Sequence, residues 1–258
     1  MAAVEGKRLE GTVALITGAS SGIGEATARS LAAQGAAVAL AARRVERLQA
    51  LAQEITGHGG RALVIKTDVT EQAQAEAAIA RTVAELGRLD TLVNNAGVML
   101  LGPIENAPIE EWDRMVRLNV QGLLYVAHAA LPHLLKAAQE EPRQVADLVN
   151  ISSVAGRVAR SGSGVYNATK FGVVAFSESL RQEFTKRHVR VSVVEPGVVA
   201  TELQSHIRAE VRERSMQRFA GVEPLHAEDI AEAIAFIVTR PRRMSINEIL
   251  IRPTEQEA

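Results

Sequence analysis

The chain is 258 residues long, contains no cysteine, and carries 29 Lys and Arg residues against 30 Asp and Glu residues. The absence of cysteine excludes a disulfide scaffold, cysteine-ligated zinc and thiol catalysis, and the balanced charge gives no electrostatic reason to expect nucleic acid or a membrane surface as a partner. No apolar run approaches the roughly 20 residues of a membrane helix, and the N-terminal sequence lacks the apolar core of a secretory signal. We therefore expect a soluble, cytoplasmic protein.

Short apolar runs rich in β-branched residues alternate along the chain with longer, alanine-rich amphipathic stretches. We predict strands at 13–17, 37–41, 62–66, 91–94, 147–151, 189–195 and 245–251. We predict helices at 24–34, 45–56, 72–86, 110–139, 165–186 and 227–238. This alternation is typical of βαβ units, and strands that are apolar throughout indicate burial on both faces. The predicted fold class is α/β: a three-layer, doubly wound, Rossmann-type parallel sheet of about seven strands.

One segment departs from the alternation. Residues 201–224 are charged and helix-prone, and they lie between a Pro-Gly turn and the last predicted helix. Insertions of this kind can supply a substrate lid, and the alternative is a solvated surface helix. No repeat or linker divides the chain, so residues 1–258 are predicted to form a single domain.

The first predicted strand runs into a glycine-rich turn, and a helix follows it. Glycine lets a phosphate approach the backbone, and a helix N-terminus offers free N–H groups and a favourable dipole. A glycine turn can also end a strand for purely structural reasons, but its position at the first strand–helix junction favours a dinucleotide site. The candidate contacts in this turn are Gly18, Ser20, Ser21, Gly22, Ile23 and Gly24.

The end of the second predicted strand indicates which dinucleotide binds. An acidic residue about 20 positions after the glycine turn would bind the ribose hydroxyls of NAD, but the sequence there is Ala41-Ala42-Arg43-Arg44. A guanidinium suits a 2′-phosphate, which a carboxylate would repel. We therefore predict NADP(H), with Arg43 as the leading contact and Arg44 as the next. The alternative is that both arginines simply open a solvated helix.

Tyr166 and Lys170 are four residues apart in a predicted helix, so their side chains share one face. An ammonium near a phenol lowers the pKa of the tyrosine from about 10, which would let Tyr166 exchange a proton with a carbonyl oxygen near neutral pH. The other tyrosine, Tyr125, lies in an apolar helix and is interpreted as a core residue. Upstream, the fifth predicted strand ends in Ser152-Ser153, where a hydroxyl could donate to the same oxygen or merely form a turn.

Together these motifs resemble the short-chain dehydrogenase/reductase family, and the resemblance covers nearly the whole chain. It implies reversible hydride transfer between NADP(H) and a carbonyl carbon. Tyr166 would exchange the proton, and Lys170 would hold the cofactor ribose and tune the phenol. The resemblance assigns the substrate-orienting serine to Ser153 rather than Ser152. It also identifies Asn119, in the sequence Leu-Asn-Val, as the asparagine that supports the proton route.

The same resemblance implies further cofactor contacts in three segments. The pair after the third strand would meet the adenine, although Asp68 could instead cap the following helix. The Asn-Asn-Ala-Gly motif after the fourth strand would steady the sheet and line the nicotinamide side. The Pro-Gly segment after the sixth strand would reach the carboxamide through Thr201. The implied contacts are Asp68, Val69, Asn95, Ala96, Gly97, Pro196, Gly197, Val199 and Thr201.

Several stretches, among them 41–46 and 99–103, resemble a subgroup of NADPH-dependent reductases similar to clavulanic acid dehydrogenase. This implies reduction of an aldehyde or ketone, a small-molecule carbonyl or alcohol substrate, no metal, and a homo-oligomer, either a tetramer or a dimer. Two alternatives stay open: a dehydrogenase that oxidises an alcohol or 3-hydroxy acid, and a non-catalytic nucleotide-sensing protein. An arginine near the pocket could receive a substrate carboxylate or could be a surface residue. The arginines there are Arg157 and Arg160, and His206 lies nearby.

Overall fold

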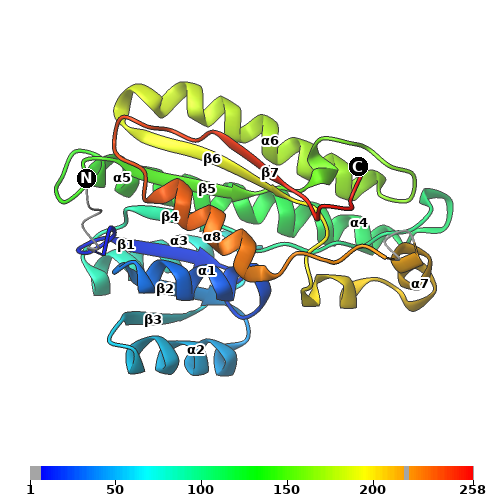
Figure 1. Cartoon of the computed structure of the whole chain (residues 1–258), viewed down its shortest axis with the longest axis horizontal. Helices are drawn as coiled ribbons and strands as arrows, with labels where there is room; N and C mark the ends of the chain where they lie inside the picture. The colour runs from blue at the N-terminus through cyan, green and yellow to red at the C-terminus, as the bar shows by residue number, and fades with distance from the viewer. Residues whose placement is uncertain (1–6, 218–220, 258) are drawn as a thin grey trace.

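In the computed structural model, which describes residues 7–217 and 221–257, seven parallel strands form one sheet between two layers of helices (Figure 1). Their order across the sheet is β3-β2-β1-β4-β5-β6-β7. The strands are β1 Val13–Thr17, β2 Ala37–Ala42, β3 Arg61–Lys66, β4 Thr91–Asn94, β5 Ala146–Ile151, β6 Val189–Pro196 and β7 Glu248–Ile251. The predicted α/β class and the seven-stranded parallel sheet are confirmed.

The α-helices are α1 Gly22–Ala33, α2 Val45–Gly57, α3 Gln72–Leu86, α4 Ile109–Val116, α5 Leu123–Ala137, α6 Gly164–Phe184, α7 Ala209–Gln217 and α8 Ala227–Val238. The short helical turns are η1 Ile104–Asn106, η2 Arg117–Gly122, η3 Val154–Gly156, η4 Thr185–Arg187 and η5 Glu202–His206. Helices α1, α2 and α8 cover one face of the sheet, and α3, α5 and α6 cover the other (Figure 1).

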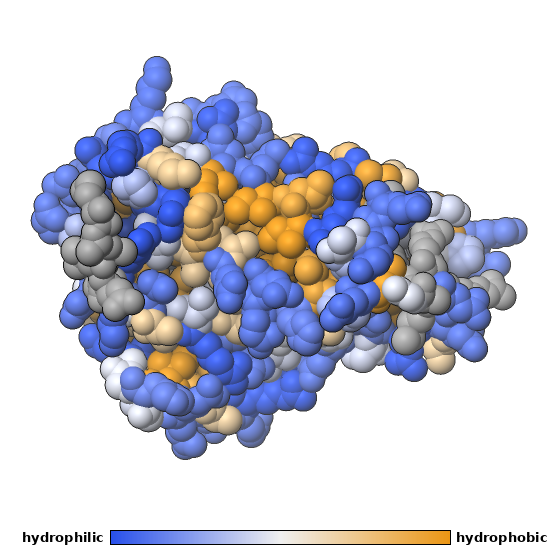
Figure 2. Space-filling model, viewed as in Figure 1, coloured by the Kyte–Doolittle hydropathy of each residue, from blue (hydrophilic) through white to orange (hydrophobic). Residues whose placement is uncertain are grey.

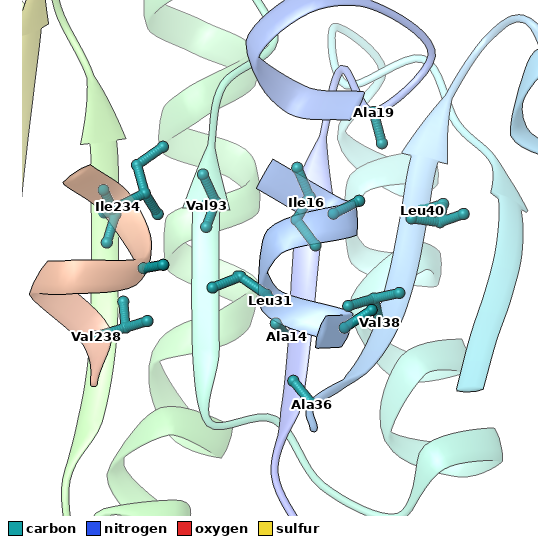
Figure 3. Close-up of a cluster of buried hydrophobic side chains, with 14 of the residues drawn as sticks. Ala14, Ile16, Ala19, Leu31, Ala36, Val38, Leu40, Val93, Ile234 and Val238 are labelled. Atoms are coloured by element: carbon teal, nitrogen blue, oxygen red, sulfur yellow. The ribbon is translucent and has the colours of Figure 1, made fainter. Parts of the chain in front are cut away.

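The strands are apolar throughout because both of their faces are buried. In β1, Ala14 and Ile16 pack toward Leu31 of α1, in the same cluster as Ile234 of α8 (Figure 3), whereas Leu15 points to the opposite face. Alternate residues of a strand always project to opposite sides of a sheet. Two apolar clusters therefore hold the three layers together, one on each side of the strands.

The path of the chain creates a crevice at one edge of the sheet. From β1 the chain proceeds outward to β2 and β3, and then returns to pair β4 with the other side of β1. Loops at the carboxyl ends of β1 and β4 therefore diverge, and ligands bind in the crevice at such a switch point. The candidate site residues follow the carboxyl ends of β1 to β6.

The helix predicted over 110–139 is present as one helical run from Ile109 to Ala137, but a π-helical turn interrupts it. The structure contains α4, then a π-helical turn, η2, and then α5, which ends at Ala137. In this wide turn Asn119 bonds through its side chain to the backbone of Val98, and Gly122 packs so closely on Val69 that a Cβ would lie 2.9 Å from Val69 Cγ2. Single wide turns inside helices are frequent at functional sites.

The last strand begins at Glu248, so the predicted start at residue 245 is wrong. The preceding loop is held by Arg190 of β6, whose guanidinium donates to the carbonyl of Met244 at 2.7 Å. The hydroxyl of Ser245 bonds to the side chain of Asn247 at 2.9 Å. These contacts keep the loop out of the ladder until Glu248 pairs with Val193.

Candidate active site

A cavity of about 660 Å³ lies at the carboxyl ends of the strands and runs from the end of β2 to the 201–224 segment. Most of the residues predicted as site residues line it, and two do not: Gly24 and Asn119. The predicted residues that line the cavity are Gly18, Ser20, Ser21, Gly22, Ile23, Arg43, Arg44, Asp68, Val69, Asn95, Ala96, Gly97, Ser153, Tyr166, Lys170, Pro196, Gly197, Val199 and Thr201.

The glycine turn has a backbone that other residues adopt poorly. Gly18 and Gly22 have φ angles of 67° and 55°, a region that favours glycine. Gly24 has an ordinary φ but no space, because a Cβ there would lie 2.5 Å from both Asn95 Nδ2 and Gly18 O. Helix α1 begins at Gly22, and no side chain caps its first turn. Its leading N–H groups therefore remain available to an anion.

Asn95 ties the glycine turn to the neighbouring strand. Its side chain donates to Thr17 O at 2.9 Å, and its backbone N–H donates to Thr17 Oγ1 at 3.0 Å. The preceding Asn94 donates to Asn150 Oδ1 of β5 at 3.0 Å. The asparagine motif thus links β1, β4 and β5 beside the crevice, in agreement with the expectation that it steadies the sheet.

The two arginines after β2 differ in their surroundings. The side chain of Arg43 is 63% exposed, and its ion-pair contact is a long one, 3.9 Å to Asp68. Arg44 lies on the glycine turn, where Nη2 donates to Ser21 Oγ at 2.6 Å and Nε donates to Ser20 Oγ at 3.1 Å. Both guanidinium groups border the cavity, and Arg43 is the more open of the two to an incoming phosphate.

Asp68 does not cap the next helix. The residue at the N-terminus of α3 is Glu71, and Asp68 Oδ1 instead accepts from the backbone N–H of Thr70 at 3.0 Å and from its hydroxyl at 2.8 Å. The capping interpretation is therefore wrong, because Asp68 lies three residues before the N-cap and its side chain closes a local turn instead. The other carboxylate oxygen faces Arg43.

Tyr166 lies in the first turn of α6 and is 6% exposed. Ser153, at the end of β5, lines the same cavity, and its hydroxyl donates to Pro196 O at 3.4 Å. Burial raises the pKa of Tyr166 to about 12, and the nearby Ser153 side chain opposes this rise. Ser152, by contrast, is buried and donates to Lys170 O at 3.0 Å. Ser153 is thus the serine that meets the phenol, whereas Ser152 anchors α6.

Lys170 is buried one turn further along α6. Its Nζ donates to Ile151 O at 2.8 Å and lies 5.8 Å from the centre of the Tyr166 ring. Burial lowers the pKa of Lys170 to about 8. The expectation that this ammonium lowers the Tyr166 pKa is wrong for the structure as it stands, because desolvation dominates at both groups and Lys170 is directed to the end of β5.

Asn119 holds the backbone beside these residues. Its amide accepts from Val98 N at 2.8 Å, donates to Val98 O at 2.9 Å, and donates to Thr169 Oγ1 of α6 at 3.2 Å. A Cβ on Gly97 would lie 3.3 Å from Asn119 Oδ1 and 3.9 Å from Lys170 Nζ. Asn119 therefore stands behind the cavity wall, close to Lys170.

One wall residue was missed by the sequence analysis. Gln256, near the end of the chain, accepts a hydrogen bond from Val198 N through its Oε1 at 2.9 Å and lines the cavity. A Cβ on Gly197 would force the end of the Gln256 side chain to move. Gly197 N also donates to Ile251 O at 2.7 Å. No pattern in the sequence pointed to Gln256, because its role depends on where the chain returns in space.

The residues considered for a substrate carboxylate divide into two groups. Arg157 does not line the cavity: it pairs with the fully buried Glu195 at 2.7 Å and with Glu248. Arg160 and His206 do line it. Burial and the nearby Arg114 lower the pKa of His206, so this imidazole is shifted toward its neutral form. The surface interpretation thus holds for Arg157 alone.

The 201–224 segment forms η5 and α7 and borders the cavity with several apolar side chains. Arg208 ties it to α4 through Glu111 at 3.0 Å. Residues 218–220 of this segment lie outside the described residues. Within residues 7–217 and 221–257, no three His, Asp or Glu side chains gather as a metal site requires. None of the helices in that part of the chain is both long and apolar enough to cross a membrane.

Comparison with known proteins gives consistent similarities. Residues 12–212 match the family model of short chain dehydrogenases. An uncharacterized oxidoreductase of Staphylococcus saprophyticus is 37% identical over 246 residues, covering 95% of this chain and 96% of that protein. The closed form of serine dehydrogenase complexed with NADP+ has a TM-score of 0.86 at 33% identity, covering 96% of this chain and 97% of the other. A 3-ketoacyl-(acyl-carrier-protein) reductase from Brucella melitensis, complexed with NADH, has a TM-score of 0.82 at 31% identity, covering 95% and 98%.

Proposed function

The chain belongs to the short chain dehydrogenase family, and from that premise we propose that it is an NADP(H)-dependent oxidoreductase that reduces an aldehyde or ketone to an alcohol. The observation that carries the proposal is the meeting of Ser153, Tyr166 and Lys170 on the wall of the cavity onto which the glycine turn opens. These residues combine a proton donor, a polar anchor and a dinucleotide site in one crevice.

The donor set in the cavity suits a dinucleotide phosphate. The uncapped N-terminus of α1 offers N–H groups to a pyrophosphate, and the exposed guanidinium of Arg43 offers a fork to a 2′-phosphate. The NADP+ complex of the similar serine dehydrogenase agrees with this choice. Asp68 and Val69 would border the adenine, and Thr201 and Val199 the carboxamide. When bound, the nicotinamide would supply the hydride, and the protein would supply position and electrostatics.

Tyr166 is in the protonation state that carbonyl reduction requires. Because burial raises its pKa to about 12, the hydroxyl keeps its proton at neutral pH and can donate it to a carbonyl oxygen. Ser153 would hold that oxygen beside the phenol. As the phenolate forms, the ammonium of Lys170 would stabilise it, and the same group would bind the ribose hydroxyls. Asn119 would keep the Val98 backbone in place behind them. Hydride transfer is reversible, so the same residues would serve oxidation of the alcohol.

The test is a screen of small aldehydes and ketones, including 3-oxo acids, with NADPH and NADH consumption followed in parallel by absorbance. We expect turnover with NADPH to exceed turnover with NADH for every accepted substrate. Equal use of the two cofactors would contradict the NADP assignment. Tight NADPH binding without turnover of any carbonyl would favour the nucleotide-sensing alternative.

We also propose that the protein is a cytoplasmic homo-oligomer, a tetramer or otherwise a dimer. Figure 2 shows hydrophobic side chains gathered on one face of the molecule. Phe236 of α8 and Leu250 of β7 are 46% and 43% exposed. Large apolar side chains grouped on a surface favour contact with another subunit. Light scattering after gel filtration measures the state directly, and a monomer would overturn this part of the proposal.

A further inference from the structure

At the end of the cavity near β2, where the adenosine of the cofactor would bind, a carboxylate is already paired with two arginines. Glu202, the first residue of η5, accepts a hydrogen bond from Arg44 Nη1 at 2.7 Å through one oxygen. Through the other oxygen it accepts from Arg47 Nη1 at 2.6 Å. The two arginines lie one turn apart at the start of α2, so Glu202 bridges them as a phosphate oxygen pair would.

This bridge crosses the crevice. Arg44 rests on Ser20 and Ser21 of the glycine turn, on the β2 side of the switch point. Glu202 belongs to the chain that leaves β6, on the opposite side. The two sides also touch at the preceding residue, because a Cβ on Gly22 would lie 3.0 Å from Thr201 Cγ2. The start of the 201–224 segment is therefore fastened across the path of a bound dinucleotide.

We propose that Glu202 weakens the preference for NADP(H) as an internal anion, which the 2′-phosphate of NADP(H) displaces from Arg44 and which NAD(H) leaves in place. The proposal rests on the proposed function. Its chemistry is competition: a carboxylate and a phosphate cannot share one guanidinium fork without repelling each other. Arg43, which lacks such a close carboxylate, receives the phosphate first, and Arg44 follows once Glu202 leaves.

Two consequences follow from the displacement. Glu202 lowers the affinity for NADP(H) below what Arg43 and Arg44 would give alone, so the protein releases the cofactor more readily. Binding of the phosphate also frees residues 201–207 from α2, so only the phosphorylated cofactor changes the mobility of this segment. The pKa of Glu202 is lowered to about 2 by its two arginines, so the carboxylate is charged throughout the physiological range.

The test compares Glu202→Gln with Glu46→Gln, a control that removes an exposed carboxylate from the first turn of α2 that pairs with neither Arg44 nor Arg47. Dissociation constants for NADPH, NADH, 2′,5′-ADP and 5′-AMP are measured by fluorescence and calorimetry. We expect Glu202→Gln to bind NADPH and 2′,5′-ADP about three- to tenfold more tightly, as suits partly exposed ion pairs. Binding of NADH and 5′-AMP should stay unchanged, and the control should match the wild type for all four.

Whether Glu202→Gln binds NADPH more tightly or more weakly decides whether the proposal holds. Weaker NADPH binding by Glu202→Gln would mean that Glu202 orients Arg44 for the phosphate, which overturns the proposal, and so would equal changes for both cofactors. If the wild type binds none of the phosphorylated probes, the proposed function itself fails. Hydrogen exchange supplies a second readout: residues 201–207 should exchange faster in the wild type with 2′,5′-ADP than with 5′-AMP. An equal rate with the two probes would overturn the displacement.

Discussion

The two ends of the cavity hold their charged side chains in different ways. At the adenosine end, Arg43 and Arg44 are exposed, and the carboxylates that they face, Asp68 and Glu202, are half-buried and exposed. At the nicotinamide end, Tyr166 and Lys170 are buried, and Lys170 is bonded to the backbone. Water and salt screen the first group, whereas the second is desolvated and its pKa values move away from their usual range.

The difference in burial indicates how readily each end of the cavity can change during evolution. Exposed ion pairs contribute little to stability, so the adenosine end can change its preference for a cofactor at small cost to the fold. Buried groups are held by the surrounding structure, so a change at the nicotinamide end disturbs both chemistry and packing. Substitutions at the two ends should therefore separate cofactor choice from turnover.

The largest effect is expected for Tyr166→Phe. Loss of the proton donor should lower kcat by about a hundredfold to ten-thousandfold, while the dissociation constant for NADPH stays within about twofold, because the phosphate contacts lie at the other end of the cavity. Stopped-flow and equilibrium fluorescence measure the two quantities. Tyr125→Phe is the matched control, since Tyr125 lies in α5 away from the cavity. A near-native rate for Tyr166→Phe would remove Tyr166 from the mechanism.

A smaller effect is expected at the adenosine end, and it should differ between neighbours. Arg43→Ala should weaken NADPH binding by roughly tenfold to a hundredfold, the value of one or two charge-assisted hydrogen bonds, with NADH unaffected. Arg44→Ala should weaken both cofactors, because Arg44 also supports Ser20 and Ser21 of the glycine turn. Titration of both variants with both cofactors measures the dissociation constants. If Arg43→Ala and Arg44→Ala change them in the same way, the two arginines do not have different roles.

The smallest expected effect is a shift in the pH at which Tyr166 ionises. The sequence has two tyrosines, so in Tyr125→Phe the absorbance of tyrosinate reports Tyr166 alone. Burial raises its pKa from 10.0 to about 12. The folded protein then keeps a proton that the unfolded chain loses, and this contribution to stability falls as pH rises between these two values. Circular dichroism recorded in parallel shows whether the fold persists. A step near pH 10 in the folded protein would contradict the burial argument.

Much of the fold could be predicted because its pattern is local. Strands such as β1 and β4 are buried on both faces, so their apolar runs mark both ends. The helix over 110–139 was predicted but its π-helical turn was not, because the amphipathic pattern continues through η2 and nothing in the sequence shows that Asn119 bonds to Val98. A side chain that reaches a backbone group in another loop leaves no local trace.

The parts of the candidate site that were predicted from the sequence are those with a local sequence pattern. Motifs such as the glycine turn and the Tyr-x-x-x-Lys pair are short, and each lies at one strand end, so their meeting follows from the parallel sheet. The bridge from Glu202 to Arg44 joins residues that the sequence places far apart, and it was missed. The direction of the Tyr166 pKa shift was also missed, because spacing along a helix shows proximity to Lys170 but not the extent of burial.

The contact between Gly197 and Gln256 has a consequence for how relatives diverge. A side chain at position 197 would meet the amide end of Gln256, so the flexible Gln256 side chain would have to move away from it. Loss of Gln256 in turn leaves Val198 N without its acceptor. Substitutions at these two sites should therefore be inherited as pairs, and a set of relatives in which they vary independently would show that this contact imposes no constraint.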